Sequence, residues 1–238
     1  MALDAFDSST TFPSAAPAPA MAAPSSYPAW ANFEMDRRRN RWWAFPVLGG
    51  IARLVALIPH IIVLALLGIL FGTFGSQAGS VPVYVMGLAF WVLWIPVLFT
   101  GHYASWGYGM VGGYLRWSTR VGAFALGITD HYPPFSMRVV DHPVEISFSR
   151  PESHNRWWAV PLLGYVVKMI ILIPHFFCLT GLGLVAVILY FTMWIPVLFT
   201  GSYPEAPYGF MCGLMRWSLR VLAYLDGLID RYPPFSFS

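Results

Sequence analysis

Two long uncharged stretches dominate the pattern of hydrophobic and polar positions along the chain. No Lys, Arg, Asp or Glu lies between Arg53 and Arg116, and none lies between Lys168 and Glu205. A helix of about 20 apolar residues crosses the hydrocarbon core of a bilayer, so each stretch has room for two spans. We expect two helical hairpins, with spans near 46–71, 82–100, 161–180 and 184–201.

The segments that follow the hairpins have the spacing of amphipathic helices. Residues 105–128 and 207–229 carry several aromatic residues and arginines one helical turn apart. In the second segment one apolar arc contains Leu214, Trp217, Val221, Tyr224, Leu225 and Leu228. Such helices are typical of the membrane surface, and both segments are predicted to lie in the cytoplasmic interface.

Short segments before the first span of each hairpin predict strands. Alternation of apolar and polar residues indicates a strand with one buried face, and it is clearest at 143–148, which has a counterpart at 28–33. Residues 138–140 and 235–237 can add further strands. We therefore expect a small cytoplasmic β-sheet that joins the two parts of the chain.

The whole arrangement occurs twice, in residues 27–136 and 142–236. The repeated motifs are Asn-Arg-Trp-Trp at 40–43 and 155–158, Ile-Pro-His at 58–60 and 173–175, Trp-Ile-Pro-Val-Leu-Phe-Thr-Gly at 94–101 and 194–201, and Tyr-Pro-Pro-Phe-Ser at 132–136 and 232–236. Self-similarity on this scale indicates a duplicated unit. Because each unit has an even number of spans, the two share one orientation, as parallel repeats around an axis along the membrane normal. The sequence thus predicts an all-α membrane protein, a pseudo-two-fold bundle of four transmembrane helices with interfacial helices and the small sheet beside it.

This organisation divides the chain into three regions. Residues 1–27 form a tail rich in Pro, Ala and Ser, with too little apolar surface to fold alone. Residues 28–136 form the first membrane repeat, and 137–238 form the second together with its leading strand. The tail lacks the basic start and apolar run of a signal peptide, so the first span is expected to act as an uncleaved anchor.

Composition supports the membrane assignment. The chain is 57% hydrophobic and 11% charged, whereas soluble domains carry about 25% charged residues. Lys and Arg lie at the ends of the uncharged stretches, which by the positive-inside rule places both termini in the cytoplasm and the hairpin tips at 72–81 and 181–184 outside. Cys178 and Cys212 are expected to be free thiols, since neither has an extracellular partner.

The order of these motifs resembles a known family. The alternating strand, Arg-Trp-Trp, Ile-Pro-His, Trp-Ile-Pro-Val-Leu-Phe-Thr-Gly and Tyr-Pro-Pro-Phe, in this order and twice over, resemble a bacterial integral membrane family catalogued as domain of unknown function 4389. The resemblance covers nearly all of 27–236. It implies a small protein of the bacterial inner membrane, and it brings no established activity and no catalytic residues.

His60 and His175 are the candidate chemical groups within the spans. An ionisable residue there suggests a function, because placing it in the membrane is costly. Neutral imidazole ligates haem iron or the magnesium of a chlorophyll, so these histidines are candidate ligands for haem or bacteriochlorophyll. The structural alternative is that Pro59 and Pro174 free carbonyls in the preceding turns and give the histidines a hydrogen-bonding role. A proton pathway is a third interpretation.

Two pairs of arginines one helical turn apart are candidates for lipid binding. Arg116 with Arg120, and Arg216 with Arg220, lie in the predicted interfacial helices. Each pair can clamp an anionic headgroup, and the alternative is that the four side chains only snorkel to the membrane surface.

Other charged residues offer less chemistry. Arg53 and Lys168 match across the two units and are expected to snorkel or to pair near the cytoplasmic end of a span. Asp130 is followed by His and its counterpart Asp230 by Arg, so that histidine is not part of the repeated pattern. No phosphate-binding loop, Gly-x-Ser-x-Gly or His-Glu-x-x-His motif occurs, which argues against an enzyme or a pump.

These features favour a non-enzymatic accessory subunit of a larger complex in a bacterial cytoplasmic membrane. Its expected partners are other integral membrane subunits and membrane lipids, with no nucleic acid. The first alternative is a subunit of an electron-transfer or photosynthetic complex that binds haem or bacteriochlorophyll through His60 and His175. The second is a module that binds anionic lipids.

Overall fold

The computed structural model describes residues 27–35, 39–45, 48–71, 88–160 and 163–238. Its elements are β1 (Ala29–Phe33), α1 (Arg41–Ala44), α2 (Leu48–Phe71), α3 (Leu88–Thr100), α4 (Ser105–Ala125), β2 (Val144–Phe148), the short 3₁₀ helix η1 (Arg156–Ala159), α5 (Leu163–Thr192), α6 (Trp194–Thr200) and α7 (Glu205–Leu225). Nearly all of the predicted tail, the predicted outer loop 72–81 and the start of the predicted span 82–100 lie outside the described residues.

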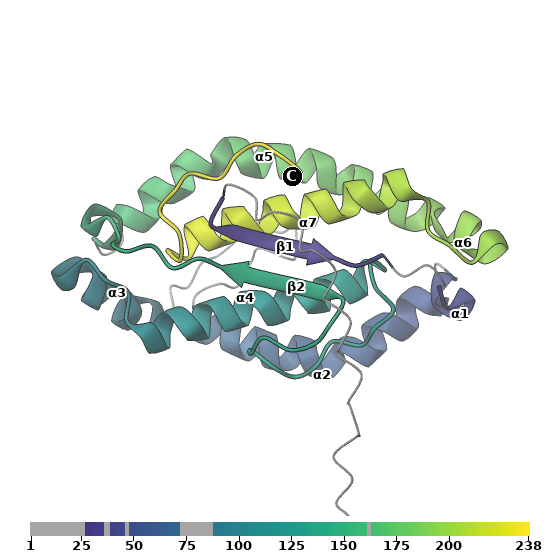
Figure 1. Cartoon of the computed structure of the whole chain (residues 1–238), viewed down its shortest axis with the longest axis horizontal. Helices are drawn as coiled ribbons and strands as arrows, with labels where there is room; N and C mark the ends of the chain where they lie inside the picture. Colours follow the sequence, from purple (N-terminus) through teal and green to yellow (C-terminus); the bar gives the residue numbers. More distant parts are fainter. Residues whose placement is uncertain (1–26, 36–38, 46–47, 72–87, 161–162) are drawn as a thin grey trace, which may run out of the picture.

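A two-stranded antiparallel sheet lies at the centre of the molecule (Figure 1). β1 from the first half pairs with β2 from the second, with Ala31 opposite Ile146. Alternate residues of both strands are buried, as the period-two pattern predicts. The predicted strands at 28–33 and 143–148 are therefore confirmed, whereas 138–140 and 235–237 are not strands.

The two halves of the chain exchange elements around this sheet. β1 packs on α7 of the second half and β2 packs on α4 of the first, while α1 contacts α6 and α3 contacts η1. Backbone bonds fix the exchange, because the N–H of Arg39 donates to the Gly201 carbonyl at 2.9 Å and the N–H of His154 donates to the Gly101 carbonyl at 2.8 Å. The halves thus share one hydrophobic core.

α4 and α7 are central helices and not surface helices. All six residues of the apolar arc predicted on the second of these helices are buried. α4 and α7 contact each other, flank the sheet in Figure 1, and pack on α2 and α5 respectively. The predicted helices at 105–128 and 207–229 are therefore confirmed, and their apolar faces pack in the protein core, while their predicted position at the cytoplasmic interface stays a prediction.

The second predicted hairpin is replaced by a continuous helix. α5 runs without a break through Gly181 and Gly183, where a turn was expected. A turn exposes backbone N–H and C=O groups that need polar partners, and the only hydroxyl there, that of Thr180, donates back to the Phe176 carbonyl of the helix at 2.7 Å. A Cβ built at either glycine meets nothing within 4 Å, so no neighbour forces a bend.

Among the described residues, two helices and not four are long and apolar enough to cross a membrane. They span Leu48–Gly68 and Leu163–Thr200. α2 and α5 lie on opposite edges of the molecule in Figure 1, each packed on the central helix of its own half. The predicted four-helix bundle is therefore not formed by the described residues, because the strands and the central helices separate α2 from α5.

Glycines end the two central helices. Gly127 and Gly227 have φ of 70° and 74° and follow α4 and α7 directly. The N–H of the next residue donates to the carbonyl of Ala123 at 2.8 Å or of Ala223 at 3.0 Å, as in a helix closed by a left-handed residue. A Cβ at Gly227 would lie 2.6 Å from the Trp94 ring, so this end also needs glycine for the close approach of the other half.

Candidate functional site

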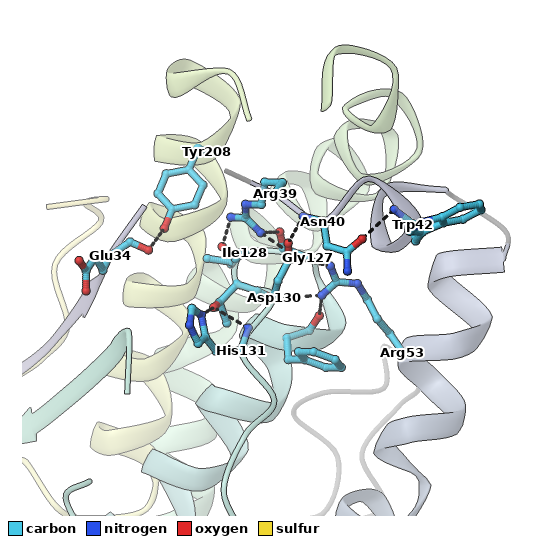
Figure 2. A network of polar contacts seen from close by, with 12 residues as sticks. Glu34, Arg39, Asn40, Trp42, Arg53, Gly127, Ile128, Asp130, His131 and Tyr208 are labelled. Atoms are coloured by element: carbon cyan, nitrogen blue, oxygen red, sulfur yellow. Dashed lines mark hydrogen bonds and ion pairs between the residues drawn. The ribbon is translucent and has the colours of Figure 1, made fainter. Parts of the chain in front are cut away.

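The first junction lies where the segment before α1 meets the end of α4, and we define it by Arg39, Asn40, Arg53 and Asp130 (Figure 2). The Asp130 carboxylate accepts hydrogen bonds from the Arg53 guanidinium at 2.5 Å and from the Asn40 N–H at 2.9 Å, and it lies 3.5 Å from the Arg39 guanidinium. The exposed fractions of the side chains are 3% for Arg39, 4% for Arg53 and 16% for Asp130. This is a buried ion-pair network, in which losing one partner is costly.

The same arginines cap the C-terminus of α4. Arg53 donates to the carbonyls of Phe124 at 2.7 Å and Thr129 at 3.0 Å, and Arg39 donates to the carbonyl of Gly127 at 2.8 Å. The last carbonyls of a helix have no partner within the helix and carry partial negative charge, which favours cations. The arginines therefore tie α2 and the segment before α1 to the end of α4.

The second half of the chain completes the first junction. The Arg39 guanidinium lies 5.6 Å and 5.8 Å from the ring centroids of Tyr203 and Tyr208. Tyr190 and Trp194 also line the open hollow at this junction, whose cavity volume is about 40 Å³. The hollow thus combines two guanidinium groups with one carboxylate, and the terminal nitrogens of both guanidinium groups donate to the protein's own oxygens, whereas Arg39 Nε has no hydrogen-bond partner.

The second junction has the corresponding position at the end of α7, and we define it by His154, Asn155, Lys168, Asp226 and Asp230. The N–H of Asn155 donates to the Asp230 carboxylate at 2.6 Å, as Asn40 does to Asp130. The buried Lys168 ammonium donates to the Tyr224 carbonyl at 2.9 Å, which matches the bond from Arg53 to Phe124. The two junctions therefore share their backbone contacts and differ in their charged groups.

The differences concern His154 and Asp226. His154 occupies the place of Arg39 and lies 5.7 Å from the Tyr103 ring of the other half. Asp226 occupies the place of Leu126 and is 5% exposed. A hollow with a cavity volume of about 10 Å³ lies at this junction, lined by groups that include His154, Lys168 and Tyr103. Among the described residues, no group of three or more His, Cys, Asp or Glu side chains is placed to hold a metal ion.

His60 is fully buried in an aromatic box. Its Nδ1 accepts a hydrogen bond from the Trp117 indole at 2.9 Å, and its ring stacks on Phe135 with 3.7 Å between centroids. The Tyr132 ring covers it from 5.0 Å, and the Tyr132 hydroxyl donates to the Ala56 carbonyl at 2.9 Å. That carbonyl lies in the turn opened by the helix proline, so the Tyr-Pro-Pro-Phe motif closes the place that Ile-Pro-His creates.

His175 has the same surroundings in the second half. Its Nδ1 accepts from the Trp217 indole at 2.8 Å, its ring stacks on Phe235 at 3.8 Å, and Tyr232 lies 5.0 Å away. The Tyr232 hydroxyl donates to the Ile171 carbonyl at 3.3 Å. Each histidine is therefore enclosed within its own half of the chain.

These hydrogen bonds fix the tautomer of both histidines. A ring nitrogen that accepts a hydrogen bond carries no proton, so the neutral imidazole holds its proton on Nε2. A metal ligand needs a lone pair, which a protonated Nε2 lacks. Nε2 is buried in both histidines and has no hydrogen-bond partner of ordinary geometry. The geometry therefore supports the structural role of His60 and His175 and counts against ligation of haem or bacteriochlorophyll.

We expect Trp117→Phe to lower the free energy of unfolding by about 1–3 kcal/mol, because it leaves the buried His60 Nδ1 without a donor. Replacing both partners, with Trp117→Phe and His60→Leu together, should recover part of this loss, since no polar atom then remains unpaired. Denaturant unfolding in detergent, followed by circular dichroism, measures both. If the two substitutions lower the free energy of unfolding additively, so that the double variant loses as much as the two single variants together, the hydrogen bond is unimportant.

The four arginines proposed from the sequence as lipid clamps bind the protein's own backbone. Arg116 donates to a β2 carbonyl at 3.2 Å and Arg216 to a β1 carbonyl at 2.8 Å. Arg120 and Arg220 are 1% and 2% exposed and donate to carbonyls of the segments after their helices. These contacts hold each strand on the central helix of the other half, and they leave Arg120 and Arg220 inaccessible to a lipid headgroup.

The two junctions contain charged residues that the sequence did not identify as members of a site. Of the two expectations for Arg53 and Lys168, snorkelling is not observed and pairing is. Arg53 pairs with Asp130, and Lys168 donates to a helix carbonyl. Arg39 and Asp226 were not among the candidate residues proposed from the sequence. The usable signal is a matched cation within each long apolar helix, followed by a matched acid after each central helix.

Comparison with known families gives a match in the second half of the chain. Residues 163–236 match the model of a family described as "Domain of unknown function (DUF4389)". The matched region begins with α5, contains Lys168, His175 and Asp226, and ends with the Tyr-Pro-Pro-Phe motif. It supports the family resemblance for one copy, in the second half of the chain. No curated protein and no solved structure matches the chain.

Proposed function

We propose that this protein is a non-enzymatic accessory or structural subunit of a larger complex in a bacterial cytoplasmic membrane, made of two tandem copies of the family unit, with both termini in the cytoplasm. The tandem copies are supported by the repeated motifs and by the corresponding contacts of the two halves, such as those of His60 and His175. The membrane location is supported by the length and composition of α2 and α5.

The observation that carries the proposal is the exposed apolar surface of α2 and α5. On α2 the exposed fractions are 53% for Ile62 and 62% for Leu66, and on α5 they are 82% for Phe177 and 62% for Ile188. Soluble monomers rarely expose apolar patches of more than a few hundred Å². This surface therefore requires a lipid or protein neighbour.

Protein neighbours are favoured by the aromatic side chains on this surface. Phe177 and Phe191 on α5 and Phe199 on α6 are 82%, 54% and 77% exposed. Large aromatic side chains are among the residues that dominate binding energy at protein interfaces. Most polar groups of the described core are directed inward, at backbone carbonyls and at the junctions, which leaves the outer faces of α2 and α5 for packing.

The two alternatives have less support from the geometry. Ligation of haem or bacteriochlorophyll conflicts with the tautomer of His60 and His175, and a colourless preparation of the protein would exclude it. Lipid binding by Arg116, Arg120, Arg216 and Arg220 conflicts with their backbone contacts, and it requires a bound anionic lipid that is lost when they are changed to Gln.

Photo-crosslinking in the native membrane tests the proposed function. A photoreactive amino acid at Phe177, on the exposed face of α5, is expected to form one dominant crosslink to a protein that also copurifies in fixed stoichiometry in mild detergent. Val139 is the matched control, because it is 76% exposed but lies outside α2 and α5. Crosslinks to lipid alone at Phe177, with a monodisperse isolated protein, would contradict the accessory role.

A further inference from the structure

The second junction differs from the first by three substitutions that replace fixed charges or apolar groups with titratable ones. Arg39 corresponds to His154 and Leu126 to Asp226, and Lys168 stands in the place of a guanidinium. A guanidinium stays charged at any physiological pH, whereas carboxyl and imidazole groups exchange protons near neutrality when their surroundings shift them. The two junctions therefore have one architecture and two kinds of chemistry.

Polar atoms without partners are concentrated at the second junction. Asp226 is 5% exposed and its Oδ2 accepts no hydrogen bond, and His154 is 6% exposed with neither ring nitrogen in a hydrogen bond of ordinary geometry. The Lys168 ammonium has three donors and makes one hydrogen bond, to the Tyr224 carbonyl. Buried polar groups in proteins are nearly always satisfied, and ordered water is the usual partner where protein atoms are not.

The hollow at this junction gives such water a place. It is lined by His154, Lys168, Tyr103 and Asp230 and by Gly227, which follows Asp226 in the chain, and its cavity volume is about 10 Å³. One water molecule needs a cavity of roughly 10–15 Å³ and two to four polar partners. The hollow therefore offers polar partners and room for about one water molecule.

Burial of Asp226 brings its pKa close to neutral pH. Burial raises the pKa of Asp226 to about 7, although the attraction of Lys168 from α5 acts against this. Tyr103, from the loop between α3 and α4, is the other titratable group on which the Asp226 charge acts. Burial also lowers the pKa of His154, and Asp230 offsets this only in part while Lys168 and Arg150 add to it. At neutral pH the imidazole is therefore uncharged and available as a hydrogen-bond acceptor.

We propose that the second junction is a hydrated proton-binding site, in which Asp226 takes up and releases one proton through water held between Lys168 and His154. On release, the O–H bond of the Asp226 carboxyl breaks and the proton passes to the bound water and then to solvent. The carboxylate that remains is stabilised by the Lys168 ammonium. The first junction has no such group at Leu126 and stays in one charge state.

Infrared spectroscopy of the full-length protein in lipid vesicles tests this proposal. A carboxyl C=O band that titrates with a midpoint near pH 7 is expected, and it should vanish in Asp226→Asn and persist in Asp230→Asn. If some variants fail to fold, Asp226→Leu provides a second version of the key change, because the first junction already holds leucine at this place. A band that persists in both Asp226 variants, or no titrating band, would overturn the proposal.

Two further measurements separate the roles of water and of Lys168. Transfer to D₂O should shift the band within the mixing time, because water reaches the carboxyl, and a band unshifted after hours would refute the hydrated site. Lys168→Met should move the midpoint upward by about one pH unit, a tenfold gain in proton affinity, since the cation that favours the carboxylate is removed. An unchanged midpoint in Lys168→Met would refute the pairing of Lys168 with Asp226.

Discussion

Asp130→Ala is expected to lower the free energy of unfolding by about 3–5 kcal/mol, the usual cost of removing one partner from a buried ion pair. The substitution leaves Arg39 and Arg53 buried close to each other without a carboxylate between them. It also removes the acceptor of the Asn40 N–H. This is a large part of the 5–15 kcal/mol that typically stabilises a domain. Denaturant unfolding in detergent micelles, followed by circular dichroism, measures the loss.

Asp230→Ala is the matched control for this prediction. Asp230 accepts from the Asn155 N–H at 2.6 Å as Asp130 does from Asn40, but in the described part of the chain no cation lies within 4.0 Å of its carboxylate. Its removal should therefore cost less than that of Asp130, about 1 kcal/mol for the hydrogen bond and in addition the longer-range attraction between its charge and the buried Lys168 ammonium. Asp130→Asn, which keeps an acceptor and loses the charge, should fall between the two. Equal losses at Asp130 and Asp230 would show that the ion pairs contribute nothing.

The local elements of the fold could be predicted from the sequence because each has its own period. Alternation at 28–33 and 143–148 gave the paired strands, and helical spacing at 105–128 and 207–229 gave α4 and α7. The first uncharged stretch predicted the span at 46–71 where α2 lies, whereas the spans predicted at 161–180 and 184–201 are replaced by the continuous α5, and Cys178 and Cys212 are free thiols as expected. The correctly predicted features depend on neighbouring residues alone, which is why they can be read without tertiary contacts.

The exchange of elements between the halves could not be predicted, because the repeated motifs make the alternatives equivalent. A strand that packs on α4 could pack on α7 by the same contacts, since Arg116 and Arg216 each offer a guanidinium to a strand carbonyl. The continuous course of α5 could not be predicted either, because it also depends on contacts between distant parts of the chain. Two glycines suggest a turn in isolation, but α6 is needed at the far end of the molecule to contact α1, which a hairpin at Gly181 does not allow.

The candidate sites show the same division between local and tertiary information. The sequence identified His60 and His175 as unusual, but their role depends on which ring nitrogen holds the proton, and the indoles of Trp117 and Trp217 decide this from a different helix. The local sequence around Asp226 suggests only the end of a helix. Its chemistry follows from burial against the other half, and that contact has no counterpart in the local sequence.

Asp226→Leu is expected to stabilise the protein, and to do so more at pH 8 than at pH 5. The folded protein holds the pKa of Asp226 at about 7, whereas an unfolded aspartate has a pKa of about 3.9. Below pH 3.9 both states are protonated and the carboxyl has no pH-dependent cost. As the pH rises from about 4 to 7 the unfolded chain loses the proton first, so the wild-type protein is progressively destabilised, and above pH 7 the cost is constant.

The shift of about three units corresponds to about 4 kcal/mol at full effect, at roughly 1.4 kcal/mol per unit. From pH 5 to pH 8 the stabilisation by Asp226→Leu should therefore increase by about 2–3 kcal/mol, measured as the difference between the unfolding free energies of variant and wild type. Leucine changes the apolar packing equally at both pH values, and the titratable groups on which the Asp226 charge does not act are common to both proteins, so these contributions cancel in the comparison; Lys168 and Tyr103 are the groups on which that charge does act. A stabilisation that is the same at pH 5 and pH 8 would mean that Asp226 ionises as freely in the fold as in the unfolded chain, which its burial at the second junction does not allow.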